Sequence, residues 1–256
     1  MVFQGLGRDE AEAVWRPFFD WVAASPQEFA VVSSLQVLAT PGRGFWDPAT
    51  LRRIPGSIVA DDRPGAHPAD IYYVGNVDEA GQVIHAYQST WLAASLLEAD
   101  QREHLVDALT AAAGHSQVEI YFGKGLAGGR SEAIDATRGT AMNPAVLDAF
   151  ALAICGAGAP PAYPGVPGHE PDIEKARRDA AAVTAAMGEL RNLTPRPASY
   201  VWETNYFEPN WQDSFWGDNY PRLRAVKDKY DPDGLFFLHH GVGSEDWSAD
   251  GFVRKS

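Results

Sequence analysis

The chain has 256 residues, of which 45% are hydrophobic and 11% aromatic, so it is long and apolar enough to bury a sizeable core. Its formal net charge of -13 argues against nucleic acid and anionic membranes as main partners. Its single cysteine, Cys155, excludes disulfides within the chain, and the absence of any signal peptide or run of ~20 apolar residues favours a cytoplasmic protein.

A stripe of apolar side chains predicts an amphipathic helix over residues 9 to 22. Asp9 can cap this helix, with Glu12 reaching back to the cap, and Pro17 is expected to disturb its hydrogen bonding. The stripe consists of Ala11, Val14, Trp15, Phe18, Phe19 and Val22.

The order of the next elements predicts an α+β fold. Two further helices are expected, at 100 to 113 and at 172 to 193, each with one apolar face. Because strands and helices do not alternate as βαβ units, we predict an antiparallel sheet covered by helices. Strands are expected at 29–38, 71–74, 84–87, 117–122 and 150–154, with a turn at 79–81 and loops at 40–68 and 156–168.

The C-terminal residues predict a helical tail that contains a tight turn. Asp231-Pro232-Asp233-Gly234 lacks the full set of calcium ligands, so it indicates a turn between a helix ending near Tyr230 and a strand at 235–238. The adjacent His239 and His240 would point to opposite faces of an extended chain. They are therefore not expected to chelate a metal together, and we predict no metal site.

Two segments carry candidate functional side chains. After Pro197, extended backbone would send Tyr200 and Trp202 to one side and Glu203 to the other. A phenol or carboxylate there could act as a base if burial or a nearby charge moved its pKa towards neutrality. The glycine-rich run 123–129 lacks the Gly-Lys-Ser/Thr ending of a P-loop, which leaves a hairpin with an exposed Lys124 as the structural alternative.

The C-terminal motifs resemble the berberine-bridge-enzyme-like branch of the FAD-linked oxidases. The resemblance extends from Tyr200 to Trp247, through Trp-Gln-x-Ser-Phe-Trp-Gly-x-Asn-Tyr, Lys-Tyr-Asp-Pro and His-Gly-Val-Gly-Ser-Glu. It implies a C-terminal segment that covers a flavin. Tyr200 would be the base, although Trp202 stands where the family has Asn, and Glu203 would be an alternative acid or base.

The resemblance also implies positions for ligand contacts. Tyr121 and Lys124 would face the substrate cavity together with Trp202, and His240 would lie near the flavin together with Tyr200. Lys124 could stabilise an alkoxide or a reduced flavin by its charge.

The same resemblance predicts a domain division. Residues 1–195 would form the substrate-binding domain and 196–256 the berberine-like segment, with the N-terminal FAD-binding lobe of the family absent. The chain is therefore expected to belong to an FAD-dependent oxidoreductase that oxidises a small alcohol, sugar or related C–H substrate. It would be unable to hold FAD alone, either as a truncated product or beside a separate FAD-binding subunit. The alternative is a flavin-free module that binds a small ligand.

Overall fold

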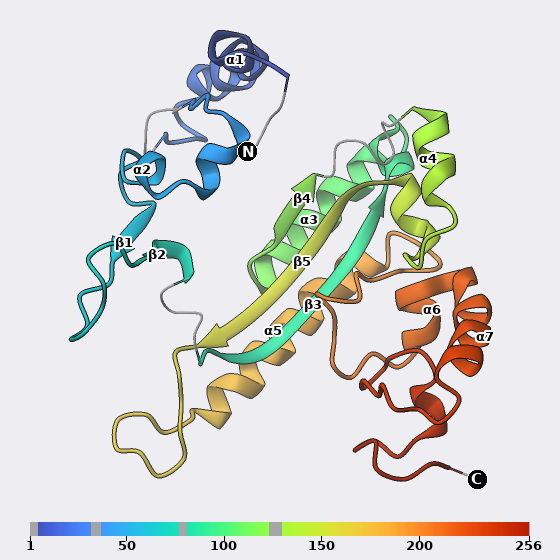
Figure 1. The fold of residues 1–256 in the computed structure, drawn as a ribbon. Helices are drawn as coiled ribbons and strands as arrows, with labels where there is room; N and C mark the ends of the chain where they lie inside the picture. Colours follow the sequence, from blue (N-terminus) through green and yellow to red (C-terminus); the bar gives the residue numbers. More distant parts are fainter. Residues whose placement is uncertain (1–4, 32–36, 77–80, 123–129, 256) are drawn as a thin grey trace. The chain divides into compact units, whose positions relative to one another are not determined.

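The computed structural model describes residues 5–31, 37–76, 81–122 and 130–255. The chain divides into two compact units, Met1–Ala80 and Gly81–Ser256 (Figure 1). The boundary expected between residues 195 and 196 stays a prediction. None of the helices in the described ranges is long and apolar enough to cross a membrane.

The first unit contains a long helix and a two-stranded sheet. Its elements are α1 (Arg8–Ala24), the 3-10 turn η1 (Gly42–Trp46), α2 (Pro48–Leu51), β1 (Ile58–Ala60), β2 (Ile71–Tyr73) and η2 (Val74–Asn76). Helix α1 confirms the predicted amphipathic helix, but its cap is Gly7, whose backbone N–H donates to the Glu10 carboxylate at 2.7 Å. The prediction of Asp9 and Glu12 as the capping pair is therefore wrong by two residues.

The pairing of the short strands also differs from expectation. β2 pairs antiparallel with β1, with Ile58 opposite Tyr73, so it forms no hairpin with the strand that begins at Val83. The described residues 29–31 and 37–38 are not in a strand, contrary to the prediction for 29–38, and residues 79 and 80 of the predicted turn lie outside the described ranges.

The second unit has a three-stranded antiparallel sheet in the order β3-β5-β4, which confirms the α+β prediction. Its elements are β3 (Val83–Ala93), η3 (Ala94–Leu97), α3 (Arg102–His115), β4 (Glu119–Phe122), α4 (Ser131–Thr137), η4 (Pro144–Asp148), β5 (Ala149–Ala159) and α5 (Ile173–Arg191). The C-terminal part adds α6 (Trp211–Trp216), η5 (Gly217–Asn219), α7 (Tyr220–Tyr230) and η6 (Ser244–Asp246).

Strands β3 and β5 are longer than the composition predicts. Residues 156 to 159 are rich in Gly and Ala and were expected in a loop, yet they continue β5. Glycine is required there because a Cβ on Gly156 would lie 2.8 Å from the Tyr87 ring, and one on Gly158 would lie 2.9 Å from the Val83 carbonyl oxygen. These glycines therefore mark close packing within the sheet.

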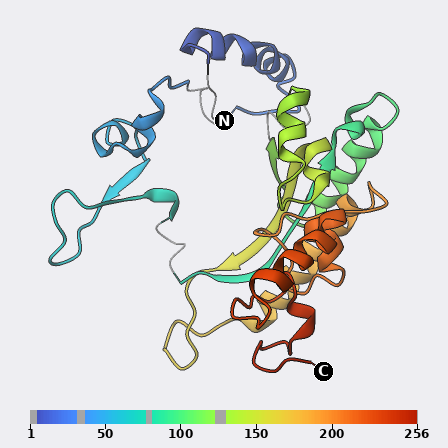
Figure 2. The same cartoon turned by 45° about the vertical axis from the view of Figure 1, so that its right-hand side comes forward.

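Helices α3 and α5 cover one face of this sheet (Figure 2). Ala151, Ala153 and Cys155 of β5 pack with the buried residues of both helices. Small residues on the central strand let the helices approach closely. The helix residues in this core are Leu105, Ala112, Val183, Ala186, Met187 and Leu190, from the faces that their spacing predicts.

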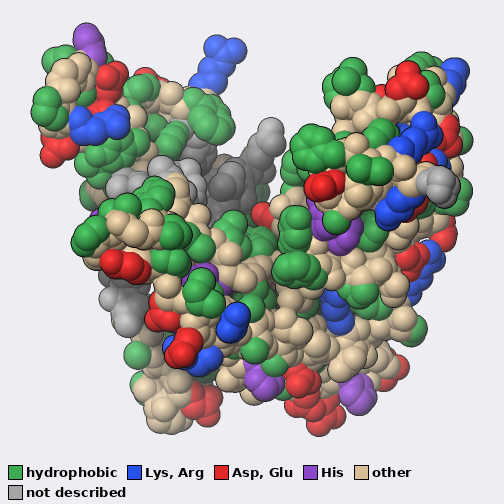
Figure 3. All heavy atoms as spheres, turned by 90° about the horizontal axis from the view of Figure 1, so that it is seen from below, with side chains coloured by type: hydrophobic (Ala, Val, Ile, Leu, Met, Phe, Trp, Pro, Cys, Tyr) green, Lys and Arg blue, Asp and Glu red, His purple; other side chains and the backbone are tan. Residues whose placement is uncertain are grey.

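Large apolar side chains also remain at the surface. Figure 3 shows hydrophobic side chains, in green, among acidic and basic groups on the face viewed from below. The exposed apolar side chains of the C-terminal residues include Phe207, Leu235 and Phe236, each with more than three quarters of its surface exposed.

The turn predicted at 231–234 is confirmed, since the Gly234 N–H donates to the Asp231 carbonyl, but residues 235–238 form no strand.

Candidate functional site

The tail is fixed to the free edge of β3. The Trp91 N–H donates to the Ala198 carbonyl at 2.9 Å, and the Tyr200 N–H donates to the Ser89 hydroxyl at 3.1 Å. The Ser199 hydroxyl donates to the Ser89 carbonyl at 2.8 Å. These bonds position the residues after Tyr200 beside the sheet.

The chain then reverses direction. The Glu203 N–H donates to the Tyr200 carbonyl at 3.0 Å, which closes a turn over residues 200–203. The predicted extended strand is therefore wrong at this point, and the side chains do not alternate as it required.

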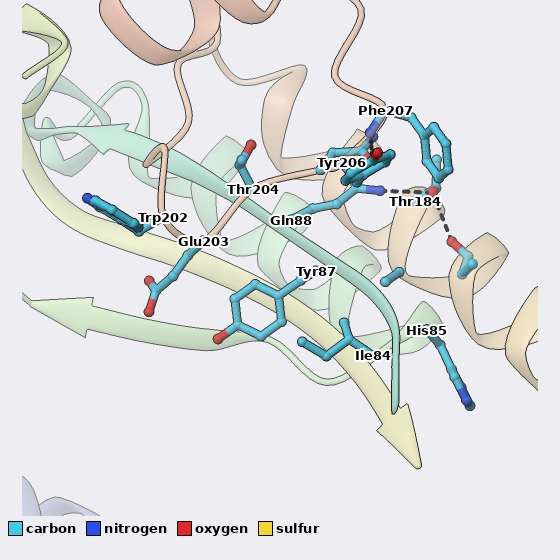
Figure 4. Close-up of a pocket in the computed structure, with 13 residues that line it drawn as sticks. Ile84, His85, Tyr87, Gln88, Thr184, Trp202, Glu203, Thr204, Tyr206 and Phe207 are labelled. Carbon is cyan, nitrogen blue, oxygen red and sulfur yellow. Dashed lines mark hydrogen bonds between the residues drawn. The ribbon is translucent and has the colours of Figure 1, made fainter. Parts of the chain in front are cut away.

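A cavity of about 820 Å³ lies between this turn, β3 and α5. Its size is within the range of small-molecule sites. Figure 4 shows Glu203 and Tyr87 on the same side of the sheet with their polar ends directed towards the same region. The lining residues are Ile84, His85, Ala86, Tyr87, Gln88, Ala180, Thr184 and the run 202–207.

The sheet face opposite the helices carries several titratable groups near this cavity. Ala86 and Ile120 pack towards the helix core, so strand alternation turns Tyr87, Glu119 and Tyr121 to the other face. The Tyr121 hydroxyl donates to the Glu119 carboxylate at 3.0 Å. A second hollow of about 190 Å³ is lined by both Tyr87 and Glu119.

Burial and like charges set the protonation of these groups. Burial, and then the charge of Glu119, raise the pKa of Glu203. The pKa of Tyr87 is raised by burial first and then by Glu203 and Glu119. For Tyr121 the hydrogen bond to Glu119 is the main cause of a raised pKa. The face therefore has a negative potential that favours the protonated forms.

The opposite wall of the cavity is fixed to α5. The Gln88 amide donates to the Thr184 hydroxyl at 3.0 Å, and His85 Nδ1 lies 2.7 Å from the Asp179 carboxylate. The Thr204 hydroxyl oxygen is buried and has no hydrogen-bond partner among the described residues. A polar ligand group that reached it would recover part of that desolvation cost.

The predicted site residues are distributed unevenly around this cavity. Trp202 and Glu203 line it, and Trp202 is 79% exposed. Tyr121 lies on the same sheet face but does not line the cavity. Tyr200 does not line the cavity; it is half-buried with its ring 5.9 Å from that of Trp91, two residues before the run 202–207 that supplies the wall. Lys124 lies outside the described residues.

His240 does not line the cavity but is in a column of stacked rings that begins at the lining residue Tyr206. The ring centroids of Tyr206 and His239 are 4.1 Å apart, and those of His239 and His240 are 3.9 Å apart. Trp211 stacks on His240 at 5.4 Å. The two histidines therefore lie face to face, contrary to the prediction, because His240 has a left-handed backbone with φ of 56°. No cluster of three or more metal-ligand side chains is found within the described ranges.

Sequence reasoning missed Tyr87 and Glu119. The alternation of β4 could have found Glu119, because it is two residues before Tyr121. Tyr87 gave no such signal, since its position depends on Gly156, which is 69 residues later in the chain.

The cavity fits a ring or a small substrate better than an entire dinucleotide. Its lining is aromatic and apolar, with the carboxylate of Glu203 at one wall. A diphosphate needs converging N–H groups or cations, and no described lining residue is Lys or Arg. The residues present therefore do not fit the diphosphate part of FAD.

Comparisons with known proteins agree with the C-terminal motifs. Residues 199–243 match the family model "Berberine and berberine like". The chain is 44% identical over 88 residues to FAD-linked oxidoreductase notD' of Aspergillus versicolor, which is 33% of this chain and 14% of the relative. It is 46% identical over 81 residues to the VAO-type flavoprotein oxidase VAO615 of Thermothelomyces thermophilus, again 14% of that protein.

Solved structures extend the likeness to the fold of almost the whole chain. The VAO-type flavoprotein MtVAO615 from Myceliophthora thermophila C1 matches 95% of this chain with a TM-score of 0.60 and 24% identity. MtVAO713 from the same organism gives a TM-score of 0.61 at 21% identity. The matched region spans 38% and 37% of those chains, respectively. Residues 199–243 are thus similar to the berberine-like segment of FAD-linked oxidoreductases, and the chain has the fold of a part of the VAO-type flavoproteins.

Proposed function

We propose that this chain forms the substrate side of an FAD-dependent oxidoreductase that oxidises a small alcohol, sugar or related C–H substrate. The observation that carries the proposal is that the family-matched segment, residues 199–243, supplies the cavity wall from Trp202 to Phe207. The segment that matches the family model would thus also contact a ligand in the cavity.

The flavin, when bound, would accept a hydride from the substrate carbon. This chain would orient the substrate and take the proton from its O–H or N–H group. Tyr200 and Glu203 are the proposed bases, and they lie at the two ends of one turn. The raised pKa of Glu203 brings its carboxyl closer to the range in which a general base works well.

The remaining predicted residues keep supporting roles in this proposal. Trp202 would cover the substrate, while Tyr121 and Lys124 would lie near it. His240 would help to hold the wall against the tail through its stack. Because the cavity does not fit the diphosphate of FAD, a separate FAD-binding lobe or subunit would have to hold the cofactor.

Reconstitution tests this proposal. The chain is purified alone and together with an FAD-binding lobe taken from a VAO-type relative. We expect flavin absorbance only in the mixture, and anaerobic bleaching of that absorbance on addition of a substrate alcohol. Tyr200→Phe should slow bleaching by ~10²-fold, as the loss of a positioned base would.

Tyr230→Phe is the matched control, because Tyr230 is 74% exposed on α7 and lines none of the cavities described above. It should leave the rate unchanged. Equal rates in the wild type and Tyr200→Phe would assign Tyr200 to packing. A mixture that binds no flavin, while the chain alone still binds small ligands, would favour the alternative of a flavin-free binding module.

A further inference from the structure

Tyr206, in the wall of the large cavity, is held by a pair of histidines. Its ring stacks on that of His239, and its carbonyl accepts a hydrogen bond from His239 Nε2 at 2.9 Å. Among the described residues, the hydrogen bonds and ring contacts of Tyr206 outside the run 202–207 all involve His239. Tyr206 and Phe207 are 62% and 79% exposed, so packing holds them only weakly. The position of this part of the wall therefore depends on the histidine pair, His239 and His240.

The histidine pair lies between two electron-rich rings. Tyr206 covers His239, and Trp211 stacks on His240 with an interplanar angle of 10°. An aromatic face attracts a cation, so these rings tolerate one positive charge on the pair. A second charge would place two imidazolium rings with their centroids 3.9 Å apart, and their repulsion would act against the stack. The stack is therefore favoured when the pair is neutral or singly charged, and disfavoured when it is doubly charged.

The surroundings set the acidity at which the second charge forms. Burial first, and then His239, lower the pKa of His240, while the charge of Glu208 acts in the opposite direction. Glu208 is itself bound by Arg191 of α5, which neutralises part of its attraction for a proton. The two rings of α6 that face His240 are aromatic and carry no charge. His240 therefore takes up its proton at a lower pH than a free histidine does.

The backbone at His240 provides an alternative conformation. Its φ of 56° is in the left-handed region, which is uncommon for a residue with a side chain. With an extended backbone at this position, the adjacent side chains would point to opposite sides and the two rings would separate. Repulsion within the doubly charged pair favours that change. Separation of the rings would remove the support of Tyr206.

We propose that the histidine pair is a pH switch for the cavity wall: in acid its two rings separate, Tyr206 is released and the wall from 204 to 207 opens. A switch of this kind needs a local change of charge and an element with two conformations, which here are the pair and the turn around His240. As a control of substrate access, the inference rests on the proposed function. The movement itself is measured without flavin.

Thr204 provides a reporter within this wall. Its hydroxyl oxygen is buried and has no hydrogen-bond partner among the described residues, so Thr204→Cys removes no such bond. The thiol is reacted with dithiodipyridine in the 256-residue chain, and the rate is divided by that of free cysteine at the same pH. The unmodified chain, in which Cys155 is buried, gives the background. We expect the normalised rate to rise by ~10-fold or more from pH 7 to pH 5. A rate that does not rise would overturn the inference.

Two histidine variants, each combined with Thr204→Cys, locate the effect. His240→Asn should keep the slow rate at both pH values, because Asn tolerates a positive φ and takes up no proton in this range. His104→Asn is the matched control, since His104 is exposed on α3, and it should keep the full rise. An equal rise in the two variants would contradict the role of the pair.

Nuclear Overhauser contacts between the rings of Tyr206 and His239 give a second readout in the unmodified chain. We expect these contacts at pH 7 and their loss at pH 5, with an unchanged circular dichroism spectrum. Contacts that persist at pH 5 would overturn the inference, and so would global unfolding, because the proposed change is local. This measurement decides the question if Thr204→Cys does not fold.

The outcome is distinguishable from that of the flavin experiment. A wall that opens in acid, in a chain whose reconstitution fails, would leave the switch standing and remove the oxidoreductase proposal. Bleaching of the flavin by substrate, with a wall equally accessible at both pH values, would do the reverse.

Discussion

His240 illustrates how a single residue departs from the local pattern. Its φ of 56° is uncommon for a residue with a side chain, and the surroundings hold it there by ring stacking on His239 and Trp211. Burial, and then the neighbouring His239, keep the pKa of His240 below its ordinary value. The folded state therefore favours the neutral ring.

This lowered pKa predicts a pH dependence of stability. The unfolded chain takes up a proton at His240 near pH 6.5, before the folded chain does. The free energy of unfolding should therefore fall as the pH drops below about 6.5. In His240→Asn, which tolerates a positive φ, the fall in melting temperature between pH 7 and pH 5 should be smaller.

His104→Asn is the control, because His104 is exposed on α3. It should keep the wild-type slope of melting temperature against pH. Identical slopes in the wild type and His240→Asn would show that His240 does not titrate differently in the folded protein.

At the scale of the elements, a buried ion pair joins the tail to the end of α5. Arg191 donates to both oxygens of Glu208, at 3.1 and 2.9 Å, and Glu208 is almost fully buried. The Arg191 guanidinium also donates to the Ser199 hydroxyl, which accepts a bond from the Ser214 hydroxyl at 3.1 Å. This network fixes the segment that carries the cavity wall.

Removing one partner of this pair should be costly. Glu208→Ala leaves the guanidinium partly buried without its carboxylate, so we expect a loss of ~3–5 kcal/mol in the free energy of unfolding, measured by denaturant titration. Asp135→Ala breaks an exposed pair with Arg138 and should cost less than ~1 kcal/mol. Similar losses in both variants would mean that burial of the Glu208 pair contributes little.

At the scale of the whole molecule, the two units differ in how they bury apolar surface. The contiguous core, from Leu92 to Leu190, lies entirely within Gly81–Ser256. In the first unit the aromatic residues of α1 contact one another, yet Phe18 and Trp21 remain about half exposed. Most of the stability of the chain is therefore expected to come from the second unit.

A fragment of residues 81–256 tests this expectation. Because its core needs no residue from the first unit, we expect the fragment to unfold cooperatively with a melting temperature close to that of the full chain. Circular dichroism and calorimetry would measure both. A fragment without a cooperative transition would show that residues 1–80 supply contacts that the core requires.

The sequence by itself determined the features that depend on local periodicity and short motifs. The apolar faces of α3 and α5 follow from 3.6-residue spacing, and the turn at 231–234 follows from Pro and Gly. The similarity of residues 199–243 to the berberine-like family model follows from the aromatic and glycine pattern after Tyr200. Each of these signals lies within a stretch of about fifty residues or fewer, so no long-range contact is needed to recognise it.

The tertiary structure alone decided how distant segments meet. The turn at 200–203 depends on where the edge of β3 holds Ser199 and Tyr200, and the stacking of His239 on His240 depends on Tyr206 and Trp211. Tyr87 reaches the cavity because Gly156, on a neighbouring strand, leaves room for its ring. Such positions result from packing between residues far apart in the chain, and local propensity contains no information about them.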